Sequence, residues 1–98
     1  MYAVLSKGEI FPEKRDELLK VAEGVPLLLK SQKGFKAAIL FSDDDNNEYG
    51  SIIAFETKED YETYLSGIPQ ENSDALMAMF KSGEEPQQYY VNYLILPD

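Results

Sequence analysis

Hydrophobic and polar positions near the amino terminus predict a strand followed by a helix. The apolar run 2–5, inside residues 1–10, has the composition of a short strand that begins the chain. Phe11 and Pro12 follow. Proline at the first helical position loses only an amide that has no partner there. We therefore expect the first helix to begin near Pro12.

The first helix has one apolar face and one internal break. Gly24 and Pro26 lie inside the helical pattern, and an internal proline removes a hydrogen bond and crowds the preceding turn. We therefore predict two helical pieces, 12–23 and 26–31. The apolar residues that share the face recur at spacings of three and four: Leu18, Ala22, Val25 and Leu29.

A polar block between two apolar runs predicts a hairpin in the middle of the chain. Lys33 and Gly34 form a helix stop, and residues 35–42 are almost entirely apolar and rich in strand-forming types. After the polar block 43–48, residues 49–56 resume the strand pattern. We expect the two strands to pair antiparallel.

The second half predicts another helix and a last strand. Thr57 and Asp60 match a capping box, so a helix should begin at Lys58. Gly67-Ile68-Pro69 interrupts it, as a connection or as a gate, and a further helical piece is expected over 72–82. Residues 87–96 then carry apolar side chains at both parities, which is typical of a long strand.

The order of elements predicts the fold class. Strand, helix, strand, strand, helix, strand is the ferredoxin-like split β-α-β-β-α-β motif, an α+β single domain over residues 1–98. We expect a four-stranded antiparallel sheet with helices on one face. Because both parities of 35–42 and 87–96 are largely apolar, the other face needs a cover, which a second copy of the chain would supply. A homodimer is predicted.

Composition excludes several classes of function. Eighteen Asp and Glu against nine Lys and Arg give a net charge of -9, which argues against nucleic acid and anionic membranes as partners. The chain has no Cys and no His, which removes the usual zinc sites, His-ligated haem and the Ser-His-Asp triad. We expect no metal and no cofactor. The first residues lack the pattern of an export signal, so a cytoplasmic location is expected.

Two features leave alternatives open. The acidic block 43–48 fits a solvated hairpin tip, or a weak cation site with poor calcium-loop spacing. The chain also has seven Tyr and five Phe, several of them late in the sequence. These aromatic side chains fit core or dimer packing, or a pocket for a flat organic ligand between the second helix and the sheet.

The chain resembles the antibiotic biosynthesis monooxygenase family of dimeric α+β barrels over nearly its whole length. The resemblance rests on the junction Lys33-Gly34-Phe35 and on the stretch 53–61, Ile-Ala-Phe-Glu-Thr-Lys-Glu-Asp-Tyr, where a strand ends in an aromatic residue, an acid and a helix cap. It implies cofactor-independent oxidation of aromatic phenols by O2. At the family's Trp, Asn and Tyr site positions this chain has Phe55, Ser51 and Tyr61, and its one arginine, Arg15, lies in the first helix.

The resemblance also implies roles for four residues. Tyr61 and Ser51 are the catalytic candidates, Tyr61 to hydrogen-bond and help deprotonate or orient the phenol and Ser51 to hold an oxygen. Phe55 and Tyr64 are the substrate-binding candidates that wall the pocket. The alternative hypothesis is a non-catalytic dimer that binds a small apolar or aromatic ligand or a partner protein. Isomerase and decarboxylase chemistry, which related barrels host, stays open.

Overall fold

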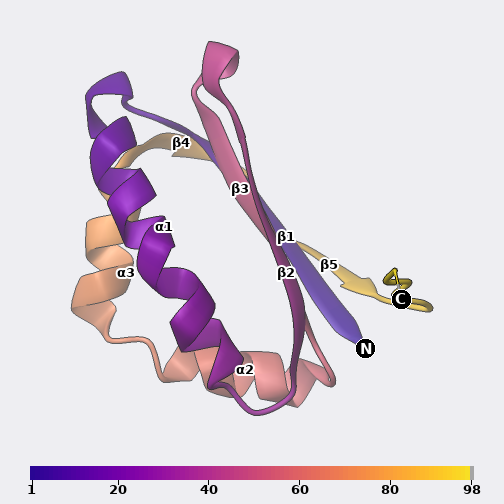
Figure 1. Cartoon of the computed structure of the whole chain (residues 1–98). Coiled ribbons are helices and arrows are strands. Elements are labelled where there is room, and N and C mark those ends of the chain that lie inside the picture. Colours follow the sequence, from indigo (N-terminus) through magenta and orange to yellow (C-terminus); the bar gives the residue numbers. More distant parts are fainter. Residues whose placement is uncertain (98) are drawn as a thin grey trace.

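The computed structural model describes residues 1–97, which fold into a five-stranded antiparallel sheet with helices on one side of it (Figure 1). The predicted α+β class, with its antiparallel sheet and helices on one face, is confirmed. Strand order is β2-β3-β1, and both β4 and β5 pair with the outer edge of β1. The strands are β1 (Tyr2–Ile10), β2 (Phe35–Asp43), β3 (Glu48–Phe55), β4 (Phe80–Gly83) and β5 (Gln87–Tyr90). The helices are α1 (Arg15–Lys30), α2 (Lys58–Ser66) and α3 (Gln70–Met77), with short 3₁₀ turns η1 (Pro12–Lys14) and η2 (Asp44–Asn46).

The first helix is one continuous element, so the predicted break between 12–23 and 26–31 was wrong. Residues 12–14 form a 3₁₀ turn, and α1 then runs through Pro26. One proline removes a single amide donor, whereas burial of Leu18 and Leu29 against the sheet holds the helix on both sides of it.

The end of α1 and the start of α2 form as predicted and lie against each other. Gly34 has φ +79°, which favours glycine, and the Asp60 carboxylate lies where a side chain at Gly34 would be. The Glu56 amide donates to the Gly34 carbonyl oxygen at 2.7 Å. Thr57 caps α2 by accepting from the Asp60 amide at 3.1 Å. These contacts fix where α2 leaves the sheet.

The carboxyl-terminal third corrects three predictions. The helical piece expected over 72–82 ends at Met77, and the strand expected over 87–96 ends at Tyr90. A strand that was not predicted, β4, forms in between, so the sheet has five strands and not the expected four. Pro86 has no amide for the ladder, so it separates β4 from β5. β5 runs antiparallel to β1, and just beyond Tyr90 the Val91 amide donates to the Met1 carbonyl oxygen at 2.8 Å.

The face of the sheet away from the helices is apolar and partly exposed. Ile39 is 59 % and Ile52 is 38 % exposed, and the two are register partners on β2 and β3. Ala3 and Ala54 are paired beside them on β1 and β3 and are buried. The two-faced apolar character expected of the sheet is therefore present. No helix within the described residues is long and apolar enough to cross a membrane.

Candidate functional site

An aromatic cluster lies where β3 meets α2. Phe55 is its centre: the ring of Tyr64 stacks on it with a centroid distance of 5.4 Å, and the rings of Tyr61 and Phe35 meet it edge-on at 5.9 Å. Tyr2 of β1 extends the cluster and lies 5.7 Å from Tyr61. The space between α2 and the sheet, where a pocket was one of the two interpretations, is occupied by these rings.

Local sequence explains why these side chains converge. Phe55 ends β3 on the helix-facing side and is 0 % exposed. Two residues later Thr57 begins the cap of α2, so Tyr61 and Tyr64 are placed one helical turn apart and return over the end of the strand. Three of the four residues predicted for the site, Phe55, Tyr61 and Tyr64, are thus brought together.

The tyrosine hydroxyls of this cluster are available to a ligand. Within residues 1–97, the side-chain hydroxyls of Tyr2, Tyr61 and Tyr64 make no hydrogen bond to protein, and none of them is sealed from solvent. Burial raises the pKa of Tyr61 and of Tyr64 above the ordinary value of 10.0, and for Tyr61 the nearby Tyr2 and Tyr64 add to the rise. Both phenols therefore keep their protons at neutral pH and act as hydrogen-bond donors.

Ser51, the fourth predicted residue, stands apart from the cluster. It lies on the same helix-facing side of β3 as Phe55, but four residues earlier, which is about 13 Å along a strand. Its register partners are Ser6 on β1 and Leu40 on β2. Ser51 therefore shares a sheet face with the aromatic cluster without touching it.

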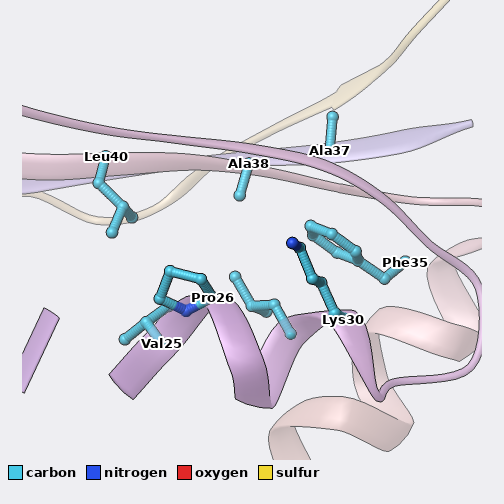
Figure 2. Close-up of a pocket in the computed structure, with 8 residues that line it drawn as sticks. Val25, Pro26, Lys30, Phe35, Ala37, Ala38 and Leu40 are labelled. Carbon is cyan, nitrogen blue, oxygen red and sulfur yellow. The ribbon is translucent and has the colours of Figure 1, made fainter. Parts of the chain in front are cut away.

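A cavity of about 300 Å³ opens between α1 and β2 (Figure 2). Figure 2 shows Ala38 and Leu40 pointing from β2 toward α1, and Lys30 extending from α1 toward the sheet. Phe35 belongs both to this cavity and to the aromatic cluster. Within the described part of the chain, Lys30 contributes the one charged side chain of the wall. The other lining residues are apolar: Val25, Pro26, Leu29, Phe35, Ala37, Ala38 and Leu40.

The β2 residues that line this cavity pair with the predicted site residues on the neighbouring strand, β3. Phe35 and Leu40 on β2 are the register partners of Phe55 and Ser51 on β3. The cavity therefore lies one strand away from both. The aromatic residues of the sequence indicated a pocket at the second helix instead, so this cavity was not predicted. The sequence feature that could have located this cavity is the apolar face of α1, because a nearly all-apolar strand, β2, lies opposite it.

A smaller hollow of about 150 Å³ lies where α1 meets the α2–α3 connection. Tyr64 lines it and also stacks on Phe55, so this hollow reaches the aromatic cluster from the other side. The interruption at 67–69 supplies part of its wall, together with Gln32 and Asn72. In the structure, residues 67–69 connect the end of α2 to the start of α3.

The acidic block 43–48 at the hairpin tip makes hydrogen bonds to the first turn of α1 and to β3. The Asp44 carboxylate accepts from the Arg15 guanidinium at 3.1 and 3.3 Å and from the Tyr49 hydroxyl at 2.9 Å. Asn46 donates to the Asp43 carboxylate at 2.7 Å. Nowhere in residues 1–97 do three His, Cys, Asp or Glu side chains gather as metal ligands. These contacts support the hairpin-tip interpretation.

Comparison with known proteins places the fold. No protein-family model matches the sequence, and no curated protein matches it either. Among solved structures, SnoaB, a cofactor-independent oxygenase from Streptomyces nogalater, is similar with a TM-score of 0.76 and 19 % identity over 99 % of this chain and 97 % of that one. A protein described as an antibiotic biosynthesis monooxygenase from Deinococcus radiodurans gives a TM-score of 0.81 and 13 % identity over 100 % and 99 %.

A third similar structure carries a ligand. The monooxygenase ActVA-Orf6 of Streptomyces coelicolor, in complex with nanaomycin D, gives a TM-score of 0.74 and 16 % identity over 99 % of this chain and 92 % of that one. At these identities the likeness concerns the fold, and the resemblance predicted from the sequence is confirmed at that level.

Proposed function

We propose that this chain, which has the fold of the antibiotic biosynthesis monooxygenases, is a cofactor-independent oxygenase of aromatic phenolic substrates. The observation that carries the proposal is the half-buried Tyr61 hydroxyl. It has no partner among the described residues, keeps its proton, and stands in a cluster of rings next to an apolar cavity.

Tyr61 acts in this proposal as a donor. Because its pKa is raised, it is a poor base at neutral pH, and the substrate loses its proton to water. The Tyr61 hydroxyl then donates to the oxygen on which negative charge develops, which stabilises the electron-rich anion that reduces O2. For an anthrone, the reaction balances as anthrone plus O2 giving anthraquinone plus water. One oxygen atom becomes the new carbonyl and the other leaves as water.

The other predicted residues take supporting roles. Phe55 is fully buried, so it sets the position of the Tyr61 and Tyr64 rings and does not itself face an open cavity. Tyr64 walls the hollow beside the cluster. Ser51 holds a distal oxygen of a polycyclic substrate, since the cavity wall extends from the partner of Phe55 to the partner of Ser51.

The second candidate function is ligand binding without turnover. A specific observation favours it: the cavity between α1 and β2 is lined by apolar side chains and Lys30, and among residues 1–97 no tyrosine or serine hydroxyl belongs to its wall. Such a wall retains an apolar or aromatic molecule but offers few groups for chemistry.

Aerobic turnover of an anthrone distinguishes the two candidates. Absorbance and oxygen uptake are followed with metal-free protein for wild type, Tyr61→Phe and Ser51→Ala. Tyr93→Phe is the matched control, because Tyr93 is 85 % exposed. Turnover that falls at least tenfold in Tyr61→Phe, with an unchanged melting curve, supports the oxygenase. Turnover equal to buffer in wild type overturns it in favour of the binding protein, and equal turnover in Tyr61→Phe removes the role of Tyr61.

We also propose that the chain forms a homodimer through the helix-free face of the sheet. Ile39 and Ile52 are exposed there next to buried alanines, and apolar patches of this kind mark association surfaces. Light scattering at micromolar concentration should give twice the chain mass of 11.1 kDa. A mass of one chain contradicts the proposal.

A further inference from the structure

The cavity between α1 and β2 is built from the one long stretch of chain that has no acidic residue. Every lining residue falls within 25–40. Residues 24–42 contain three lysines and no Asp or Glu, whereas the remaining residues carry six Lys and Arg against 18 Asp and Glu. The negative charges of this strongly acidic protein therefore lie outside the segment that forms this apolar cavity.

Of the three lysines in residues 24–42, Lys30 is the one whose side chain lines the cavity. Its side chain extends from the last turn of α1 toward the sheet, above an otherwise apolar wall (Figure 2). Within residues 1–97 no carboxylate lies within ion-pair distance of its ammonium, although Lys36, on β2, lies 4.0 Å from Glu56. The Lys30 ammonium therefore stands at the cavity without a protein counter-ion.

We infer that this cavity binds an aromatic carboxylate, with the rings between α1 and β2 and the carboxylate on the Lys30 ammonium. A charge-assisted hydrogen bond at the rim of an apolar pocket orients the ligand as well as holding it. Among the described residues, the cavity lining carries one positive side chain and no negative one, which favours an anion over a neutral or cationic ligand. The inference deepens the proposed function, on which it rests, because it assigns a charge and a position to the substrate.

Cavity size limits the ring system. A dry cavity of about 150 Å³ accommodates benzene, and sites for drug-sized ligands start at about 300 Å³. The observed cavity, about 300 Å³, suits two or three fused rings. Phe35 offers its ring to a planar ligand, and Ala38, with its small side chain, leaves the room that the ligand occupies.

The test compares an anionic probe with its neutral counterpart. Affinities for 2-naphthoate and 2-naphthamide are measured by calorimetry on wild type, Lys30→Met, Lys30→Arg and Lys33→Met. Lys33→Met is the matched control, because Lys33 belongs to the same acid-free stretch but does not line the cavity. We expect Lys30→Met to weaken 2-naphthoate about tenfold and 2-naphthamide less than twofold. Lys30→Arg should retain the preference, and Lys33→Met should behave as wild type.

A second pair of variants tests the place of binding. Figure 2 shows Ala38 pointing from β2 toward α1, into the cavity, so Ala38→Leu should abolish binding of both probes. Ala75→Leu is the matched control, because Ala75 is exposed on α3 and does not line the cavity, and it should bind both probes as wild type does. Equal losses in Lys30→Met and Lys33→Met, no preference for 2-naphthoate in wild type, or full binding in Ala38→Leu overturns the inference.

The outcome is separable from that of the oxygenase proposal. Binding of 2-naphthoate requires no turnover, and oxidation of an anthrone requires no carboxylate. Lys30-dependent binding of 2-naphthoate without anthrone oxidation contradicts the oxygenase proposal and supports the carboxylate site. Anthrone oxidation without Lys30-dependent binding supports the oxygenase proposal and contradicts the carboxylate site.

Discussion

The Arg15 guanidinium donates to the Tyr49 phenol oxygen over 2.8 Å, which joins the first turn of α1 to the beginning of β3. The same hydroxyl donates to Asp44, so helix, strand and hairpin tip meet in one network. Tyr49 lies six residues, or about 20 Å, along β3 from Phe55. The one arginine of this sequence therefore stabilises the fold far from the aromatic cluster, and the proposed site works without a guanidinium.

Loss of the Tyr49 hydroxyl should lower the free energy of unfolding. Tyr49 is buried in the core formed with Ile10, Leu18 and Met79, so Tyr49→Phe keeps the packing and removes only the hydrogen bonds to Arg15 and Asp44. We expect a loss of about 1 kcal/mol in urea denaturation. Tyr93→Phe, at an exposed position, should change nothing, and an equal effect of the two variants would contradict this role.

The same network makes stability sensitive to acid. Hydrogen bonds from Tyr49 and Arg15 lower the pKa of Asp44 below its ordinary value of 3.8. Because the folded-state pKa is depressed, the stabilisation is present above pH 3.8 and is lost as pH falls through the folded-state pKa. The difference in unfolding free energy between wild type and Tyr49→Phe should therefore narrow as the pH falls from about 6 to below 3.8. A constant difference between them would show that Asp44 is not the group involved.

Alkaline pH should destabilise the protein through the half-buried tyrosines Tyr61 and Tyr64. Burial raises the pKa of Tyr61 and Tyr64, so their contribution to stability is complete below pH 10.0 and is lost as pH rises through the folded-state pKa values. In Tyr64→Phe the decrease in unfolding free energy above pH 10.0 should be smaller than in wild type. Absorbance of tyrosinate near 295 nm, followed beside urea denaturation, checks both parts. Identical alkaline slopes in the two proteins would refute the assignment.

Truncation of Phe55 should be far more damaging than truncation of an exposed phenylalanine. Phe55 is 0 % exposed and contacts the rings of Phe35, Tyr61 and Tyr64, whereas Phe11 is 37 % exposed. Phe55→Ala should cost about 3–5 kcal/mol, and Phe11→Ala much less. Chemical denaturation measures both. Comparable losses would mean that the aromatic cluster contributes no special packing.

A charge on the helix-free face of the sheet should prevent the proposed dimer. Ile39→Glu places a carboxylate at the exposed pair with Ile52, and light scattering should then give the mass of one chain. Leu27→Glu is the control, because Leu27 is 78 % exposed on α1, on the other side of the sheet. If only Leu27→Glu changed the mass, the dimer surface would lie on the helix.

The candidate site was partly predictable, for local reasons. Phe55, Tyr61 and Tyr64 lie within ten residues of each other, so the strand end, the Thr57 cap and the helical period suffice to bring their rings together. Ser51 could be placed on the correct face by strand alternation, but its separation from Tyr61 depends on where α2 folds back. The cavity beside Lys30 depends on the distance between α1 and β2, which no local pattern encodes.

The sequence by itself determined the order of strands and helices from β1 to α3, the helix stop at Gly34, the hairpin and the cap at Thr57, because each depends on the spacing and chemistry of neighbouring residues. Tertiary structure decided that α1 continues through Pro26, since burial of Leu18 and Leu29 outweighs one lost hydrogen bond. It also decided that the carboxyl-terminal segment forms two short strands, because β4 and β5 pair with different parts of β1. Packing between segments distant in sequence set these outcomes, as it set the cavity and the role of Arg15.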